Sequence, residues 1–255
     1  MIRCVTAENM RQSDAWTIAN RTDGRTLMYR AALGTFLARH WSGETVIAAG
    51  SGNNGGDGYA LACILTGNGI KCRVVSLGEP RTDDAGYFAG LAARMGVVTE
   101  PWRPGCLRDC AEIADCLLGT GFHGNVRRDC AQVIREINVS GAFVVSVDIN
   151  SGMEADTGLA RTAVRSNLTV AVGSVKLGMT APGAGEFIGR LVCADIGIVF
   201  QREEYFIYSL EEWQREHDDK PEALLCPQYL DMRTIDVSDV RMPQGFDERP
   251  QSGYY

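Results

Sequence analysis

The chain has 255 residues, of which 45% are hydrophobic and 22% charged, as is typical of a globular protein with one main domain and an extension, or with two small domains. Its formal net charge of −7 argues against a general nucleic-acid or anionic-membrane surface, because such surfaces are rich in Lys and Arg. Nine cysteines without a C-x-x-C pair, and no signal peptide or apolar segment of membrane length, argue against a disulfide framework and a membrane span and favour a cytoplasmic protein.

Apolar, β-rich runs alternate with helical patterns over the first 200 residues. Helices are expected over 27–39, where Met28, Ala32 and Phe36 share one face, and over 83–95, with Thr82 as N-cap. Strands, several of them continuous apolar runs that suit burial on both faces, are expected at 45–49, 72–77, 115–118, 143–147, 168–172 and 191–196. The alternation predicts an α/β fold, a Rossmann-like, doubly wound, mostly parallel sheet with helices on both faces, in three αβα layers.

The end of the chain has a different character. After Ile198 the sequence is polar and acidic, with a short helix predicted near 210–217, and no clear periodicity follows Cys226. So short a tail has little core to bury. We therefore predict one domain over residues 1–200 and a C-terminal extension over residues 201–255, which is accessory to the domain and packs on it or stays partly mobile.

Three of the expected strands end in loops that combine glycine with polar residues. These loops read "GSGNNGGDG" at 50–58, "DCLLGTGFHGN" at 115–125 and "VDINSGMEADTG" at 147–158. One such loop is often only a turn. In doubly wound sheets, however, ligands bind outside the carboxyl ends of the strands. Three such loops at strand ends therefore predict a binding site.

The first of these loops matches the dinucleotide pattern G-x-G-x-x-G over residues 50–55, and Glu79 follows the next strand where a ribose-binding acid could lie. Asp57 opposes this interpretation, since a carboxylate at the start of a helix repels a phosphate unless a cation intervenes. The alternative role of Asp57 is that of a helix N-cap. A Walker A loop is excluded, because no Gly-Lys-Ser/Thr follows the glycines.

At this point the sequence resembles a known family. The stretches "GSGNNGGDGYALA", "DCLLGTGFHGN", "VVSVDINSGMEADTG" and "SNLTVAVGSVKLG", with "TAENMRQSDAWTIAN" near the N-terminus, are similar in order and spacing to the YjeF N-terminal domain family, the NAD(P)H-hydrate epimerases. The resemblance covers residues 5–198. It departs at Asn150, where the family usually has proline, and at Tyr29, where it has an acidic residue. These two changes bear on the rigidity of one loop and on the rim of the pocket.

The resemblance implies an isomerase that interconverts the R and S epimers of NADH or NADPH hydrated at C6, so that a separate ATP- or ADP-dependent NAD(P)H-hydrate dehydratase can repair the S form. It implies a homodimer and a pocket for the nucleotide, with no nucleic acid or membrane as partner. The residues that it assigns to the substrate are Asn53, Asn54, Gly55, Gly56, Asp57, Gly119, Thr120, Gly121, Phe122, His123, Gly124, Asn125 and Asp148.

The resemblance also implies a K⁺ ion held by Asn54, Asp115 and Ser151. Amide, carboxylate and hydroxyl oxygens suit a hard cation better than a transition metal. The ion would offset the repulsion between the carboxylates and an anionic ligand. A zinc site has no support, because the three histidines of the chain are far apart in the sequence.

Asp148 is our candidate for the catalytic acid–base group, because it ends a buried strand beside the ligand loops. The hydrated carbon is a carbinolamine, which loses its configuration when the hydroxyl is expelled or the ring opens. Either route needs one proton delivered and one removed, which a single carboxylate can do. The alternative role is an Asx-turn or a cap for Ser151. His123 is a weaker candidate, since a lone loop histidine is more often incidental.

Two other functions stay open. A non-catalytic YjeF-type scaffold that binds nucleotides or RNA would be indicated by loss of the acidic site residues, but Asp115, Asp148 and Ser151 are all present. An ordinary NAD-dependent oxidoreductase would need an evident hydride-transfer acid, such as Tyr-x-x-x-Lys or a placed histidine, and we find none.

Overall fold

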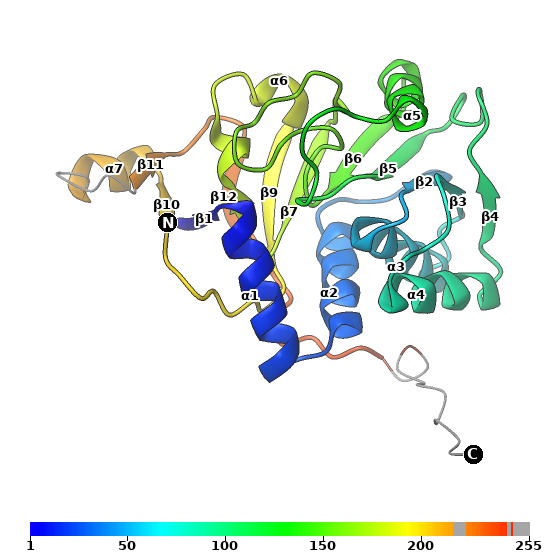
Figure 1. Cartoon of the computed structure of the whole chain (residues 1–255), viewed down its shortest axis with the longest axis horizontal. Helices are drawn as coiled ribbons and strands as arrows, with labels where there is room; N and C mark the ends of the chain where they lie inside the picture. The colour runs from blue at the N-terminus through cyan, green and yellow to red at the C-terminus, as the bar shows by residue number, and fades with distance from the viewer. Residues whose placement is uncertain (217–222, 244–245, 247–255) are drawn as a thin grey trace.

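The computed structural model describes residues 1–216, 223–243 and 246 of the chain (Figure 1). Its main sheet has eight strands in the order β12-β9-β7-β6-β5-β2-β3-β4, and every neighbouring pair runs parallel. The strands are β2 Thr45–Ala49, β3 Cys72–Ser76, β4 Val98–Pro101, β5 Glu112–Cys116, β6 Phe143–Val147, β7 Leu168–Val172, β9 Arg190–Asp195 and β12 Leu230–Asp236. The parallel sheet confirms the predicted fold class.

The strand order places the ligand-binding edge. From β2 the chain moves outward through β3 and β4, and it then returns to build β5, β6 and β7 on the other side of β2. The switch point therefore lies between β2 and β5. In open α/β sheets the carboxyl ends of the strands at such a point form a crevice in which ligands bind.

Helices cover both faces of the main sheet, as Figure 1 shows. One face carries α1 Ala7–Asn20, α2 Gly24–Leu37, α3 Asn53–Gly67 and α4 Asp83–Arg94, and the other carries α5 Arg128–Val139 and α6 Gly185–Ile188. Strand β2 shows the consequence, because Ile47 packs in the cluster under α2 and α3 while Val46 and Ala48 pack in the cluster under α5. Both faces are apolar, which explains the continuous apolar run.

Local hydrogen bonds and ion pairs explain where two of the predicted elements begin and end. Thr82 caps α4 as predicted, since its hydroxyl accepts a hydrogen bond from Ala85 N. The strand predicted at 115–118 is β5, which ends at Cys116 because the next two N–H groups donate to side chains, Leu117 to Asp115 and Leu118 to Ser151. It begins earlier because buried Glu112 is paired with Arg39.

A second, smaller sheet was not predicted. Its order is β11-β10-β1-β8, formed by β11 Ala223–Leu225, β10 Tyr205–Tyr208, β1 Ile2–Val5 and β8 Val175–Lys176. A 3-10 turn, Leu177–Thr180, follows β8. The strands are two to four residues long, too short to show a clear period in the sequence.

The described part of the C-terminal extension packs on the domain. It supplies β10 and β11 to the small sheet and β12 to the edge of the main sheet, where β12 pairs with β9. The helix predicted near 210–217 is α7 Leu210–Glu216, and His217 lies outside the described residues. A domain boundary at residue 200 stays a prediction. Across the described ranges, no helix has the length and apolar character that a membrane span requires.

Candidate functional site

A cavity of about 680 Å³ lies at the switch point of the sheet. Its floor is formed by the loops that follow β2, β5 and β6, and one wall is a face of α1. Of the predicted substrate-binding residues it is lined by Asn53, Asn54, Asp57, Gly119, Thr120, Gly121, Phe122, His123 and Asp148. Gly55, Gly56, Gly124 and Asn125 do not line it, and Asp115 and Ser151 are fully buried beneath its floor.

The glycine loop turns tightly from β2 into α3. Gly55 lies so close to the turn that a Cβ there would be 1.9 Å from the oxygen of Gly50, so only glycine fits. Gly52 is the N-cap residue, and Asp57 is the fifth residue of α3. The interpretation of Asp57 as an N-cap is therefore wrong. Glu79 is exposed and does not line the cavity, so the ribose-binding acid of a dinucleotide fingerprint is missing from it.

The surroundings of Asp57 shift its protonation equilibrium, which the sequence did not suggest. Burial raises the pKa of the Asp57 carboxyl well above its usual range, and the nearby carboxylates of Asp148 and Asp14 raise it further, against the opposing effect of Lys176. These effects favour the protonated form. A protonated Asp57 donates a hydrogen bond and does not repel a phosphate, so the expected repulsion is relieved at Asp57 itself.

Asp148 joins two of the loops. Its carboxylate accepts hydrogen bonds from Thr120 N at 3.0 Å and from Thr120 Oγ1 at 2.5 Å, and it forms an ion pair with Lys176. The N–H of Ser151 donates to Asp115 at 3.0 Å and not to Asp148. The alternative role of Asp148 as a cap for Ser151 is therefore wrong. The backbone of Asp148 has a φ of +70°, a strained conformation for a non-glycine residue that concentrates at functional sites.

Lys176 is the site residue that the sequence interpretation did not assign. It is fully buried at the end of β8, and its ammonium donates to the carbonyl of Val172 at 2.8 Å besides pairing with Asp148. A signal was present, since "TVAVGSVKLG" places a lysine inside an apolar run. A lysine buried in such a run needs an anionic or carbonyl partner.

Asn54, Asp115 and Ser151 meet under the floor of the cavity. Asp115 accepts hydrogen bonds from Ser151 Oγ at 2.6 Å and from Ser146 Oγ at 2.9 Å, and burial raises the pKa of its carboxyl against these bonds. Asn54 Nδ2 donates to the carbonyl of Leu118 at 2.9 Å, whereas Asn54 Oδ1 is buried and finds no partner in the described part of the chain. An unpaired buried oxygen costs about 1–3 kcal/mol and calls for an explanation. We call these three residues the oxygen corner.

Gly119 lets the oxygen corner approach Asp148. A Cβ at this position would lie 3.1 Å from Asp148 Oδ2 and 3.2 Å from Asn54 Cβ. A larger residue would therefore push the two side chains apart. The glycine that opens "GTG" thus has a steric role in the site in addition to its role in the turn.

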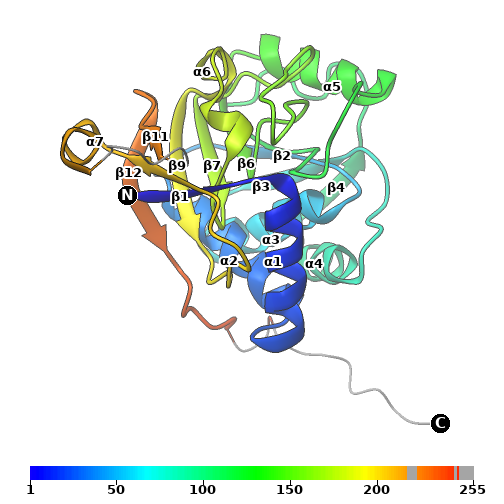
Figure 2. The ribbon, with the colours of Figure 1, turned by 60° about the vertical axis from the view of Figure 1, so that its left-hand side comes forward.

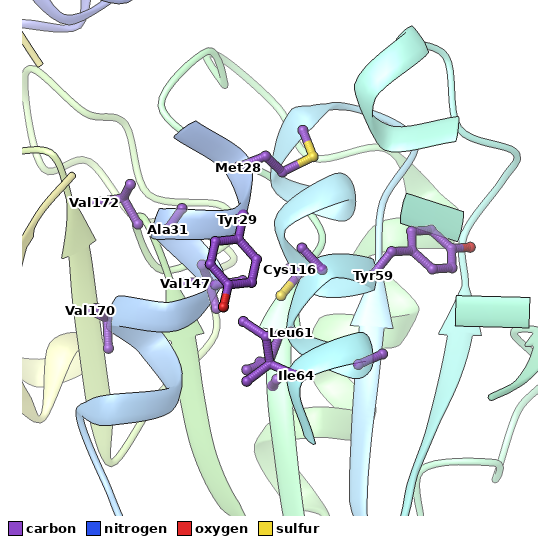
Figure 3. Packing of buried hydrophobic residues seen from close by; sticks show 14 of the residues in the cluster. Met28, Tyr29, Ala31, Tyr59, Leu61, Ile64, Cys116, Val147, Val170 and Val172 are labelled. Atoms are coloured by element: carbon purple, nitrogen blue, oxygen red, sulfur yellow. The ribbon is translucent and has the colours of Figure 1, made fainter. Parts of the chain in front are cut away.

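The two positions that depart from the family pattern are both accommodated by the fold. Asn150 is fully buried, and its amide donates hydrogen bonds to oxygens of Val164 and Ser166 and to the carbonyl of Phe187 in α6, so these bonds hold the loop in place of a proline ring. Tyr29 lies in the hydrophobic cluster between α2 and α3 (Figure 3), and it does not line the cavity. The Tyr29 change therefore leaves the lining of the pocket intact.

The wall formed by α1 was also missed. Met10, Asp14 and Ile18 follow one another at four-residue spacing, so they share one face of the helix, and all three line the cavity together with Arg11. The sequence interpretation used this helix only as part of the resemblance. A carboxyl at position 14 has no motif that marks it, and its proximity to the strand ends depends on the tertiary fold.

Comparison with known proteins agrees with this geometry. The profile of the family described as YjeF-related protein N-terminus matches residues 24–178. The chain is 33% identical over 204 residues to the NAD(P)H-hydrate epimerase of Limosilactobacillus reuteri (strain DSM 20016), covering 76% of this chain and 95% of that protein. It is 40% identical over 163 residues to the bifunctional NAD(P)H-hydrate repair enzyme Nnr of Pyrobaculum aerophilum, covering 60% of this chain and 32% of that protein.

The bifunctional enzyme of Archaeoglobus fulgidus is 34% identical over 162 residues, and the chain again spans only 34% of its length. The crystal structure of yeast ynu0 superposes with a TM-score of 0.67 at 18% identity, over 83% of this chain and 98% of that one, and so shares the fold. With the family profile covering more than half of the chain and the Limosilactobacillus protein matched almost end to end, the chain belongs to the YjeF-related protein N-terminus family.

Proposed function

We propose that the protein is an NAD(P)H-hydrate epimerase, an isomerase that interconverts the R and S C6 hydrates of NADH and NADPH. One observation carries the proposal: Asp148, a carboxylate fixed by Thr120 and by buried Lys176, faces a cavity built from nucleotide-type loops at the switch point of the sheet. The name of the Limosilactobacillus relative, matched over 95% of its length, supports the same activity.

We propose that the hydrate binds across the loops that follow β2 and β5, with its pyrophosphate on the "GTGFHG" loop. In that loop the N–H of Thr120 donates to Asp148, that of Phe122 to Gly119 and that of Gly124 to Glu154. Within the described residues, the N–H groups of Gly121 and His123 have no acceptor. These two exposed N–H groups are available for phosphate oxygens.

The oxygen corner fits the K⁺ ion that the resemblance implies. Asn54 Oδ1 is buried and unpaired among the described residues. The Nδ2 of the same amide lies 2.9 Å from the carbonyl oxygen of Leu118, and Ser151 Oγ lies 3.2 Å from that oxygen. We propose that Asn54, Asp115 and Ser151 would hold the ion. When bound, K⁺ supplies positive charge under the floor of a cavity whose side chains include four carboxyls, those of Asp14, Asp57, Asp84 and Asp148.

Asp148 is proposed as the general acid–base group. Its two oxygens have different partners, since Oδ1 is paired with Lys176 while Oδ2 accepts from Thr120. This arrangement fixes the orientation of the carboxylate toward the cavity before the substrate binds. Preorganised groups of this kind contribute typically 10²–10⁴-fold to proton-transfer steps.

The decisive experiment supplies the R hydrate together with a dehydratase specific for the S hydrate. An epimerase accelerates consumption of the R form beyond its spontaneous rate, whereas a non-catalytic YjeF-type scaffold or an NAD-dependent oxidoreductase leaves that rate unchanged. Asp148→Asn should bind the hydrate and stay folded, but should lose about 10²–10⁴-fold in the rate of epimerisation. Full turnover by this variant would exclude Asp148 from the chemistry.

The cellular setting and the assembly are also part of the proposal. All nine cysteines are free thiols, which supports a reducing compartment, and we propose the cytoplasm. The chain matches about a third of two relatives named bifunctional, which supports functional pairing with a dehydratase. A homodimer is proposed from the resemblance alone, and gel filtration with light scattering would test it.

A further inference from the structure

Asp14 stands on the wall of the cavity that faces the strand ends. It lies on α1, the helix labelled in Figure 2, between Met10 and Ile18. Both neighbours line the same cavity, and the side chain of Asp14 is half-buried. Asp148 enters from the end of β6 on the floor. The two carboxyls therefore face one cavity from different elements, and no hydrogen bond joins them within the described residues.

The other face of α1 fixes this orientation. Asn9, Ser13 and Thr17, again at four-residue spacing, are fully buried against the segment that follows β9. Asn9 Nδ2 donates to the carbonyl of Arg202 at 2.9 Å, while Gln201 N donates to Ser13 at 3.1 Å and Val199 N donates to Thr17 at 3.0 Å. We call these three hydrogen bonds the polar ladder of α1. With this face held, Asp14 must point into the cavity.

No structural role accounts for the Asp14 carboxyl. Among the residues that the structure describes, it has neither an ion pair nor a hydrogen-bond donor. Burial raises the pKa of Asp14 to about 7, the charge of Asp148 adds to this rise, and Lys176 opposes it. A half-buried carboxyl without a partner costs stability, whereas Asn or Leu at this position would not bear the cost of ionisation. Carboxyls shifted in this way are typical of acid–base sites.

We propose that Asp14 is the second proton-transfer residue of the epimerase, acting on the face of the nicotinamide ring opposite to Asp148. The proposal rests on the proposed function and deepens it. With one carboxyl on each side of the ring, the C6 hydroxyl of one epimer faces Asp14 and that of the other epimer faces Asp148. A single carboxylate on one side could serve only one of the two faces without moving.

The step balances with water as the only co-reactant. Protonated Asp14 gives its proton to the hydroxyl on C6, the C6–O bond breaks toward oxygen, water leaves, and the lone pair of the ring nitrogen forms the C=N bond of an iminium ion. A second water attacks C6 from the other face, the C=N electrons return to nitrogen, and the carboxylate of Asp148 takes the released proton. One water leaves, one enters, and one proton passes from Asp14 to Asp148. The reverse reaction returns that proton.

Asp57 has a different place in this scheme. It lies on α3 and not on α1, and its pKa is raised well above the usual range by burial and by both neighbouring carboxylates. The raised pKa favours the protonated form of Asp57, which can donate a hydrogen bond to the ligand. The other charged and titratable groups that line the cavity around Asp14 are Arg11, Asp57, Asp84, His123, Arg127, Cys130 and Asp148.

The experiment follows inversion and oxygen exchange at the same time. Each pure epimer is incubated in oxygen-18 water with the unsubstituted protein or with Asp14→Asn, Asp148→Asn or the control Asp83→Asn, which removes an exposed carboxylate from the first turn of α4. Chromatography measures inversion, and mass spectrometry measures the label in each epimer. Circular dichroism confirms folding, and Asp14→Glu tests for rescue by a carboxyl of similar reach.

We expect Asp14→Asn to lower inversion at least 10²-fold, with Asp83→Asn unchanged and Asp14→Glu partly restored. The label should still enter one epimer with retention, through Asp148, and Asp148→Asn should label only the other epimer. Inversion by Asp14→Asn within twofold of the unsubstituted protein would overturn the proposal, as would inversion by the unsubstituted protein without label. An unsubstituted protein that inverts neither epimer would instead refute the proposed function itself.

Discussion

The oxygen corner and the α1 wall border the same cavity, yet they are built by different means. Asn54, Asp115 and Ser151 each lie within a few residues of the end of a parallel strand, so the sheet topology brings them together. Asp14 lies on a helix whose orientation is set by hydrogen bonds to residues 199–202, about 185 positions further along the chain. The oxygen corner is a local consequence of the fold class. The α1 wall depends on a long-range contact.

Substitution of Lys176, the buried partner of Asp148, should have the largest effect on stability. Lys176→Met removes the buried ammonium that pairs with Asp148 and donates to Val172 O. Removing one member of a buried ion pair typically costs about 3–5 kcal/mol, because the other charge is left uncompensated. Urea unfolding should show a loss of this size. Lys71→Met, at an exposed position, is the matched control and should change the free energy of unfolding by less than about 0.5 kcal/mol. Equal losses in both variants would refute the role given to the pair.

The oxygen corner should respond to cations in a way that the wall does not. If K⁺ binds Asn54, Asp115 and Ser151, K⁺ at one hundred times its Kd should stabilise the fold by about 2.7 kcal/mol relative to tetramethylammonium. Asn54→Leu removes the unpaired oxygen and should abolish this difference. The control Asn20→Leu, at the exposed end of α1, should keep it. Calorimetric unfolding in the two salts measures the effect, and identical melting temperatures for the unsubstituted protein would exclude the ion.

The α1 wall should make the stability of the protein depend on pH, because it carries Asp14. The raised pKa of Asp14, about 7, means that the folded state binds more protons than the unfolded state between pH 4 and 7, so this carboxyl lowers stability as the pH rises through that window. Asp14→Asn should therefore gain stability over the unsubstituted protein at pH 8 and lose the advantage at pH 4. Each 1 kcal/mol of difference in the free energy of unfolding corresponds to about 2–4 °C in Tm for a chain of this size.

Differential scanning fluorimetry over this range checks the expectation. Asp83→Asn is again the control, and its offset from the unsubstituted protein should not vary with pH in this way. A pH-independent offset for Asp14→Asn would mean that the Asp14 carboxyl is ionised equally in the folded and unfolded states. Asn54→Leu should not show this contrast, because it changes no titratable group.

The sheet was predictable because its strands are buried on both faces. The runs at 45–49, 143–147 and 168–172 coincide with β2, β6 and β7, since apolar side chains are needed on either side of such strands. The short strands β8 and β11, with two and three residues, show no period to detect. Edge strand β4 was also missed, because its four residues are mostly exposed and form no apolar run.

The site residues also fall into two groups, those that a sequence pattern marks and those that it does not. Loop residues such as Asn54 and Asp148, which both line the cavity, were proposed from the sequence because they sit in motifs at strand ends, where topology guarantees proximity. Asp14 and Lys176 were not, because nothing in the local sequence states which helix face or which short strand will meet the cavity. The raised pKa of Asp57 was missed as well, since it depends on burial and on two carboxylates from distant parts of the chain.

The smallest effect on stability should reveal the long-range contact on which the wall depends. Thr17→Val keeps the shape of the side chain but removes the hydroxyl that accepts from Val199 N and donates to Ser13 O. The expected loss of stability is about 1–2 kcal/mol, but epimerisation should fall further than this loss explains, because α1 and Asp14 can then shift. Ser140→Ala is the control, since its hydroxyl bonds Ile137 O at the end of α5, far from α1. If both variants lose similar stability and only Thr17→Val loses activity, the polar ladder positions the wall; equal activities would show that the α1 wall holds its place without the polar ladder.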